Sequence, residues 1–289
     1  MVVSLDTVVG LIGWPTSHSI SPIMHNQAFH AVGLKNWCYV PMPVSPTPTT
    51  RIKEAVLGLR ALGCRGANVT VPYKEKVIPY LDSLSDEAQA IGAVNTIVVE
   101  KDGKLCGHNT DARGFLADLD EHQVSLKNSR ALVLGAGGSS RAIVYALLMS
   151  GCSEVAILNR TEAKALELAD RYKKYFPHKA ILGQQLSEEN IRHAQDFHLV
   201  VNTTSVGLGH EDNEMPWFSS VAFAPNQVVY DLIYNPPTTT LLKHAHKHGV
   251  TTISGLGMLV HQGALAFSLW TGLKAPIQEM KQAAYAALK

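Results

Sequence analysis

Charge is scarce in this sequence and nearly balanced, since 25 basic and 24 acidic residues among 289 give a net charge of +1. A nucleic-acid-binding protein usually carries a basic surface, which this composition does not provide. No apolar run approaches the roughly 20 residues that a transmembrane helix needs. The start, MVVSLDTVVG, lacks the charged segment of a secretory signal. We therefore expect neither a nucleic-acid partner nor a membrane.

Cysteine is also rare. The four cysteines, Cys38, Cys64, Cys106 and Cys152, are far apart and form no CxxC pair. This spacing favours free thiols in a reducing compartment over a disulfide or a metal site, and so predicts a cytoplasmic protein. Hydrophobic residues make up 46% of the chain, and the length suggests two compact domains.

Apolar segments of strand length alternate with helical patterns along almost the whole chain, which is typical of α/β proteins with parallel sheets. In the first third the predicted strands are TVVGLIG, WCYVPMPV and GANVTV, followed by a hairpin of NTIVVE and KLCGHNT. Further on, the predicted strands are RALVLG, EVAILN, KAILG, FHLVVNTT and QVVYDLIY, with helices between them. This second part has the pattern of a doubly wound dinucleotide-binding unit.

The tail predicts two helices without a strand. The first, GLGMLVHQGALAFSLWTG, is apolar nearly all round and should be buried. We expect it to cross back to the first part of the chain. The predicted fold is therefore two α/β domains: a discontinuous one of residues 1–112 and 256–289, and a Rossmann-type one of residues 113–255.

The segment LVLGAGGSSRA places Gly135, Gly137 and Gly138 between an apolar strand and a helix. Glycines there let the backbone approach a pyrophosphate, and the N–H groups at the helix start face it. Ser140 replaces the third glycine of GxGxxG, and a tight strand-to-helix turn would use similar residues. The strand–loop–helix context favours dinucleotide binding.

The end of the next strand indicates which dinucleotide is bound. NAD-binding units usually have an acid there that binds the ribose hydroxyls. This chain has Asn159 and Arg160 instead, with Lys164 further on. A guanidinium can pair with the 2′-phosphate of NADP. In the alternative, Thr161 caps the next helix and Arg160 is solvated, although a basic side chain at a helix N-terminus opposes the dipole. We predict NADP.

Serines occupy every second position in part of WPTSHSISPIMHN. In an extended segment, Ser17, Ser19 and Ser21 would project to one side. Ser21, which precedes Pro22, fits the N-cap of a helix. Ser17 and Ser19 would then be neutral donors for a carboxylate near the positive end of that helix. A plain serine-rich loop is equally compatible with these residues.

A second polar group lies in GANVTVPYKEK and GHNTDARGF. Strand alternation puts Asn68 and Thr70 on one face. Pro72 should begin a helix with Lys74 in its first turn, where an ammonium opposes the dipole by roughly 0.3–1 kcal/mol. Lys74 is therefore either a solvated lysine or one retained for chemistry. Asp111 is either an ordinary helix cap or a functional acid.

These motifs together carry a family resemblance. GWPTSHSISPIMHN, NVTVPYKEK, GAVNTIV, GHNTDARGF, LGAGGSSRA, NRTEAK and GLGMLVHQGALAF occur in an order that resembles shikimate dehydrogenases over nearly the whole chain. The resemblance implies that residues 1–112 and 256–289 bind the substrate and that residues 113–255 bind NADP. The implied reaction is the reversible NADPH-dependent reduction of 3-dehydroshikimate to shikimate, in the chorismate pathway of aromatic amino-acid biosynthesis.

The resemblance also implies the site residues. Ser17 and Ser19 would bind the shikimate carboxylate, and Lys74 with Asp111 would form the catalytic pair. The contacts to the ring hydroxyls would come from Asn68, Thr70, Asn95, Asp111 and Gln262, with Tyr234 nearby. The cofactor contacts would be Gly135, Ala136, Gly137, Gly138, Ser139, Asn159, Arg160, Thr161 and Lys164, with Leu232 and Gly255 beside the nicotinamide.

The sequence leaves alternatives open. Lys74 carries the proton, or it orients the substrate while Asp111 or water carries it. Quinate is a rival substrate, although relatives that accept it often have threonine at the second paired serine, so Ser19 favours shikimate. A non-catalytic dinucleotide sensor would share the fold but would not need Lys74 and Asp111. A monomer and a homodimer are both compatible with the sequence.

The segment HAHKHG places His244 and His248 on one helix face at metal-ligand spacing. No acid or cysteine lies near them in the sequence. We interpret this helix as a solvated face and predict no metal site.

Overall fold

The computed structural model describes residues 7–209 and 214–288, which form two compact units. The first unit contains the chain up to Gly114 together with Leu259–Ala287, and the second is Phe115–Met258. The chain passes from the first unit to the second inside α4 (Asp111–Glu121) and returns inside α9 (Leu256–Thr271). The sequence predicted these two boundaries at residues 112 and 255.

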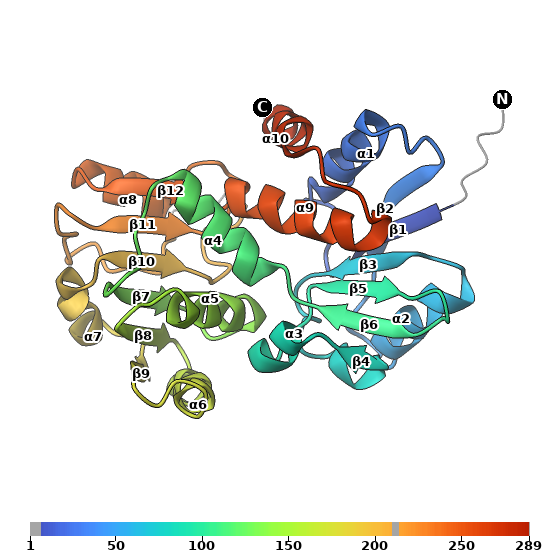
Figure 1. The fold of residues 1–289 in the computed structure, drawn as a ribbon. Helices are drawn as coiled ribbons and strands as arrows, with labels where there is room; N and C mark the ends of the chain where they lie inside the picture. Colours follow the sequence, from blue (N-terminus) through green and yellow to red (C-terminus); the bar gives the residue numbers. More distant parts are fainter. Residues whose placement is uncertain (1–6, 210–213, 289) are drawn as a thin grey trace. The chain divides into compact units, whose positions relative to one another are not determined.

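The first unit contains a mixed six-stranded sheet (Figure 1). In order across the sheet the strands are β2 (Trp37–Pro43), β1 (Thr7–Gly13), β3 (Gly66–Val69), β5 (Thr96–Val99), β6 (Leu105–His108) and β4 (Ser83–Leu84). β1 runs parallel to β2 and β3, whereas β5 runs antiparallel to β3 and β6. The predicted hairpin is therefore confirmed. β4 was not predicted, because a two-residue strand leaves no periodic signal.

Besides α9, the helices of this unit are α1 (Ser21–Ala31), α2 (Arg51–Ala61), α3 (Asp86–Ile91) and α10 (Ile277–Ala287), with a 3₁₀ turn at Ile78–Tyr80. On α2 the buried residues Ile52, Val56 and Leu59 recur at helical spacing and pack into the core. α1 lies against α10, so a segment near the end of the chain packs on one near its beginning (Figure 1).

The second unit contains a six-stranded, fully parallel sheet. In order across it the strands are β9 (Ala180–Gln185), β8 (Glu154–Asn159), β7 (Arg130–Leu134), β10 (Leu199–Asn202), β11 (Val228–Asp231) and β12 (Thr251–Ser254). This is the 3-2-1-4-5-6 order of dinucleotide-binding folds, which confirms the predicted doubly wound architecture. The strand β12 was missed, because Thr-Thr-Ile-Ser is short and mostly polar.

The connecting helices of this unit are α5 (Gly138–Met149), α6 (Glu162–Lys173), α7 (Glu188–Arg192) and α8 (Thr240–Lys247), with a 3₁₀ turn at His193–Asp196. The central residues of these strands are mostly apolar and buried, as expected for parallel strands that are covered on both faces. On α8, Nδ1 of His248 donates to the His244 carbonyl at 3.0 Å, and both rings pack on Phe223. These two histidines are therefore used in packing.

The predicted burial of the first tail helix is confirmed. Val260, Ala266, Phe267 and Trp270 of α9 are all at most 2% exposed. The Trp270 indole also donates a 3.0 Å hydrogen bond to the carbonyl of Ile97 on β5. α9 is the longest helix among residues 7–209 and 214–288, and none there has both the length and the apolar character to cross a bilayer.

Candidate active site

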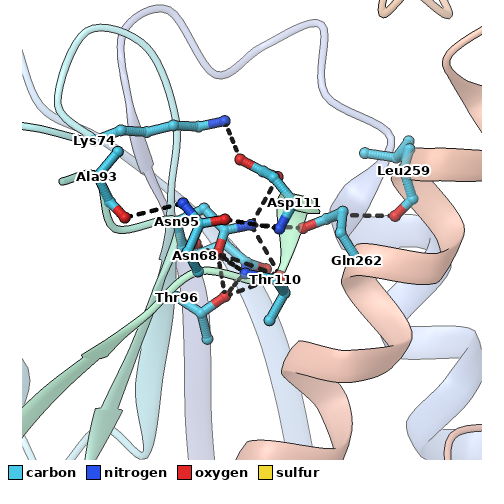
Figure 2. A network of polar contacts seen from close by, with 10 residues as sticks. Asn68, Lys74, Ala93, Asn95, Thr96, Thr110, Asp111, Leu259 and Gln262 are labelled. Carbon is cyan, nitrogen blue, oxygen red and sulfur yellow. Dashed lines mark hydrogen bonds and ion pairs between the residues drawn. The ribbon is translucent and has the colours of Figure 1, made fainter. Parts of the chain in front are cut away.

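A buried ion pair lies in the first unit (Figure 2). The Lys74 ammonium is 2.7 Å from Oδ2 of Asp111, and the two side chains are 12% and 6% exposed. Lys74 lies in the turn after β3, and Asp111 is the first residue of α4. Removing two charges from water costs more than their attraction returns unless further hydrogen bonds compensate. The surroundings of Asp111 supply those bonds.

Asn95 and Gln262 complete the polar surroundings of Asp111 (Figure 2). Nδ2 of Asn95 donates to Oδ1 of Asp111 at 2.8 Å and lies 3.2 Å from Oε1 of Gln262. Nε2 of Gln262 donates to the carbonyl of Leu259 at 2.7 Å. A Cβ at Gly114 would lie 2.7 Å from Cβ and N of Gln262, so only glycine allows α4 and α9 to approach this closely here. Lys74 and Asn95 thus contact the Asp111 carboxylate directly, and Gln262 joins the cluster through Asn95.

Asn109 and Thr110 hold the start of α4, and sequence reasoning missed both. Oδ1 of Asn109 accepts from the backbone N–H of Asp111 at 3.0 Å, while its Nδ2 donates to the carbonyl of Ala93 at 2.9 Å. The N–H of Thr110 donates to Oδ1 of Asn95 at 2.8 Å. Asn109 therefore does the capping expected of Asp111, which leaves the Asp111 carboxylate for Lys74. An asparagine just before a predicted helix was the available signal.

The local structure around Lys74 differs from the prediction. Pro72 does not begin a helix; residues 71–77 form successive turns that lead into the 3₁₀ turn. The N–H of Tyr73 bonds to the carbonyl of Thr70 at 2.9 Å, and the carbonyl of Lys74 accepts from Val94 N–H at 2.7 Å. The expected conflict between Lys74 and a helix dipole was therefore wrong. Its position is fixed by Val94 in the segment that precedes β5.

The serine segment is a turn and not an extended strand. The N–H of Ser19 bonds to the carbonyl of Thr16 at 3.2 Å, and Ser17 is exposed between them. The prediction that Ser21 is the N-cap was also wrong: Ser21 is the first residue of α1, and its N–H donates to Oγ of Ser19 at 3.2 Å. Ser19 keeps its hydroxyl proton for another acceptor. Because the turn reverses the chain, alternate positions do not share a side.

Asn68 and Thr70 lie on either side of Val69, the last residue of β3. Asn68 is buried in the strand, and its amide is hydrogen-bonded to Tyr39, Asn95 and Thr96. Thr70 lies just past the strand end and is half-buried, with its N–H bonded to the carbonyl of Ile12 at 2.9 Å.

In the glycine-rich segment of the second unit, Gly135, Ala136 and Gly137 follow β7, and Gly138 and Ser139 are the first residues of α5. Gly135 has φ +109°, and a Cβ there would lie 2.6 Å from Oγ1 of Thr203. Oγ of Ser140 accepts from the N–H of Gly137 at 3.1 Å and lies 2.5 Å from Oγ1 of Thr203. The buried Ser140 hydroxyl therefore ties the loop to the end of β10. This explains why serine stands at the third glycine position.

The end of β8 has no acid at the position that would meet an adenosine ribose. Asn159 ends the strand, and its Nδ2 donates to the carbonyl of Thr161 at 2.9 Å. Arg160, Thr161 and Lys164 are exposed, and Thr161 occupies the N-cap position of α6 without a side-chain cap. The two cations Arg160 and Lys164, together with a helix α5 whose first turn carries no acidic residue, fit a phosphorylated dinucleotide.

Leu232 and Gly255 lie side by side after β11 and β12. The N–H of Gly255 donates to the carbonyl of Ile233 at 3.2 Å, and the N–H of Leu232 donates to the carbonyl of Asn202 at 3.0 Å. Tyr234 is half-buried and follows in the same loop. The predicted nicotinamide residues of the second unit are thus brought together within it.

Asp231, at the end of β11, was missed by sequence reasoning. It is fully buried, and its carboxylate accepts from Nδ2 of Asn202 at 2.9 Å, from the N–H of Ile233 at 3.1 Å and from Oγ1 of Thr239 at 2.7 Å. This carboxylate anchors the loop that carries Leu232. Burial raises the pKa of Asp231 to about 6, although the three hydrogen bonds lower it.

The raised pKa of Asp231 predicts a pH-dependent stability. The folded protein holds the Asp231 proton more tightly than the unfolded chain, in which the carboxyl has its ordinary pKa of 3.8. Stability from this group is therefore fully present below that value and is lost as the pH rises towards about 6. Lowering the pH from about 7 to about 5 should therefore increase the free energy of unfolding by about 1 kcal/mol through Asp231. Asp231→Asn should remove that increment in denaturant titrations at the two pH values; an unchanged increment would refute the assignment.

Comparisons with known proteins agree with this geometry. Three family models match: the shikimate dehydrogenase substrate binding domain over residues 11–97, shikimate / quinate 5-dehydrogenase over residues 118–205, and the shikimate 5′-dehydrogenase C-terminal domain over residues 255–285. A shikimate dehydrogenase (NADP(+)) from Carboxydothermus hydrogenoformans is 45% identical over 276 residues, which cover 96% of this chain and 95% of that protein.

Solved structures are also similar. A shikimate dehydrogenase crystallised in complex with NADP+ has a TM-score of 0.89 at 39% identity, and the match covers 98% of this chain and 96% of that chain. Quinate dehydrogenase from Corynebacterium glutamicum, in complex with NAD, has a TM-score of 0.87 at 31% identity, with 97% and 99% covered. The chain therefore belongs to the shikimate dehydrogenase family.

Proposed function

We propose that this protein catalyses the reversible reduction of 3-dehydroshikimate to shikimate with NADPH. The observation that carries the proposal is the buried pair of Lys74 and Asp111 inside a polar cluster built from three distant segments. A structural ion pair gains little net stability from such burial, whereas buried pairs of ionisable groups are typical of sites that transfer protons. The test is NADPH formation when the purified protein receives shikimate and NADP+.

The substrate's ring hydroxyls match the donors and acceptors around Asp111. We assign these contacts to Thr70, Asn95, Asp111 and Gln262, whose side chains offer both amide hydrogens and oxygens. The carboxylate is assigned to Ser17 and Ser19, close to the start of α1. The Ser19 hydroxyl, which accepts from Ser21 N–H, has its own proton to donate to a carboxylate oxygen. Tyr234 is assigned to the substrate as well.

Lys74 is the proposed proton carrier. In the reductive direction its ammonium, held by Oδ2 of Asp111, donates a proton to the C3 oxygen as the carbonyl becomes an alcohol. In the oxidative direction the neutral amine accepts the proton of the C3 hydroxyl. Asp111 orients the amine and stabilises its charged form, and Asn95 holds Asp111 through its other oxygen. The two residues act as one unit, because their charged groups are 2.7 Å apart.

The dinucleotide site is assigned to the second unit. Gly135 to Ser139 at the start of α5 would hold the pyrophosphate, and Asn159, Arg160, Thr161 and Lys164 would hold the adenosine end with its 2′-phosphate. Leu232 and Gly255 would hold the nicotinamide ring. NADP supplies the hydride acceptor, and NADPH the hydride donor, for the C3 carbon.

Arg160 should set the preference for NADP+ over NAD+. We expect at least a roughly tenfold preference, measured as kcat/KM, because a guanidinium pairs with the 2′-phosphate. Arg160→Asp should remove it, since a carboxylate repels that phosphate and can bind the ribose hydroxyls. Lys173→Asp, which reverses an exposed charge at the other end of α6, is the matched control. Equal use of both dinucleotides by the unmodified protein would refute the assignment.

Quinate is the rival substrate, given the similarity to a quinate dehydrogenase. It differs from shikimate by an added C1 hydroxyl and the lost ring double bond. We expect Ser19 to favour shikimate, although a difference of one methyl group is worth only about 1–3 kcal/mol. We also propose a cytoplasmic location, based on its four free cysteines, and a monomer or homodimer.

A further inference from the structure

Asn68 uses both of its amide hydrogens inside the protein. Its Nδ2 donates to the backbone carbonyl of Asn95 at 3.1 Å and to Oγ1 of Thr96 at 3.0 Å. Its Oδ1 accepts from the Tyr39 hydroxyl at 2.9 Å. An amide has two hydrogens to donate, and both are already used here. Asn68 is therefore better suited to hold its neighbours than to bind a ligand.

The direction of each hydrogen bond follows from the carbonyl of Asn95, which can only accept. Because this carbonyl only accepts, the NH2 group of Asn68 must face it, and Oδ1 of Asn68 must face Tyr39. The Tyr39 hydroxyl is therefore the donor to Oδ1. Thr96 accepts from Asn68, which directs its own proton to Oδ1 of Asn95 at 3.0 Å. Nδ2 of Asn95 then faces Asp111. The bonds run one way, from Tyr39 to Asp111.

Tyr39 is itself held in place by packing. The His25 ring stacks on it with centroids 4.5 Å apart and an interplanar angle of 2°. Both rings are buried, and burial lowers the pKa of His25 to about 3, so the imidazole is neutral near neutral pH. Neither nitrogen of His25 has a hydrogen-bond partner within the described chain. His25 thus acts as a flat, uncharged surface against the phenol ring.

We infer that Tyr39, Asn68 and Thr96 are positioning residues, whose one-way hydrogen bonds orient the Asn95 amide against Asp111. The hydroxyl of Thr96 links the amides of Asn68 and Asn95, and Thr96 is fully buried. The N–H of Thr110 supports the same Asn95 oxygen from the other side. If the Asn95 amide turned over, its oxygen would face the Asp111 carboxylate. The tests of this inference that measure activity depend on the proposed function, whereas the structural test does not.

Thr96→Val tests the inference, because valine keeps the shape and removes the hydroxyl. One buried donor of Asn68 then loses its acceptor, and Asn95 loses a donor. We expect kcat with shikimate to fall by about ten- to a hundredfold, with the KM for NADP+ unchanged. Thr96→Ser should restore most of the rate. Thr271→Val, which removes a hydroxyl bonded to the Phe267 carbonyl on α9, is the control and should keep its kcat.

Tyr39→Phe provides a milder variant should Thr96→Val fail to fold. It removes the donor to Oδ1 of Asn68, and we expect a smaller fall in kcat, of about three- to tenfold. Wild-type kcat in both variants, or a loss in Thr96→Val that serine does not restore, would overturn the inference. Inactivity of the unmodified protein towards shikimate would instead reject the proposed function.

A crystal structure of Thr96→Val gives a readout that needs no activity. We expect the Asn95 amide to leave its contact with Oδ1 of Asp111, which is 2.8 Å in the unmodified protein. An unchanged contact would overturn the inference whatever reaction the protein catalyses.

Discussion

Lys74→Ala is expected to lower kcat for shikimate oxidation by about 10²–10⁴, because the substitution removes the group that we propose takes the hydroxyl proton. The KM values for shikimate and NADP+ should change far less. Steady-state kinetics with both substrates varied would separate the two effects. A change confined to KM would mean that Lys74 only binds the substrate.

The control for this substitution is Lys76→Ala. Lys76 lies in the same turn, but its side chain is exposed and its ammonium lies 5.9 Å from the centre of the Tyr73 ring. We expect near wild-type rates from it. Because Lys74→Ala leaves the buried Asp111 without its counter-ion, thermal unfolding should be measured alongside, so that lost activity is not confused with lost folding.

Asp111→Asn is expected to lower kcat by about 10²–10³, although the side chain keeps its shape. The substitution removes the negative charge that holds the Lys74 ammonium at 2.7 Å and leaves that ammonium buried beside a neutral amide. A larger loss in Lys74→Ala than in Asp111→Asn would favour Lys74 as the proton carrier. The reverse order would favour Asp111.

Asp120→Asn makes the same chemical change on an exposed residue of α4 and serves as the matched control. It should leave kcat and both KM values unchanged. Wild-type turnover in Asp111→Asn would contradict the assignment of Asp111 to the catalytic pair.

The fold was largely predictable, because the periodicity of apolar residues reports which faces are buried. The doubly wound sheet, the hairpin of β5 and β6 and the burial of α9 all follow from such runs. The strands that were not predicted are short or polar: β4 has two residues, and β12 has the sequence Thr-Thr-Ile-Ser. The turns around Ser17 and Lys74 were also missed, because their geometry depends on backbone bonds to Thr16 and Val94.

The sequence predicts candidate site residues but not how they are arranged. Lys74 and Asp111 were named from motifs, whereas their contact required β3, α4 and β5 to meet. The buried residues Tyr39 and Thr96 gave no signal of their own, because a tyrosine or threonine in a strand is ordinary. Their part in the site depends on partners in other strands. Asp231 was not predicted either, because its role depends on hydrogen bonds to Asn202 and Thr239 that the sequence does not show.

The most direct test of the account is the initial rate of NADPH formation by the purified protein, with shikimate or quinate as substrate and NADP+ or NAD+ as acceptor. We predict rapid formation with shikimate and NADP+, at least a roughly tenfold lower kcat/KM with NAD+, and a lower rate with quinate. Tight binding of NADP+ without any shikimate-dependent NADPH would contradict the account, because a folded protein with the Lys74–Asp111 pair intact would then lack the reaction assigned to it.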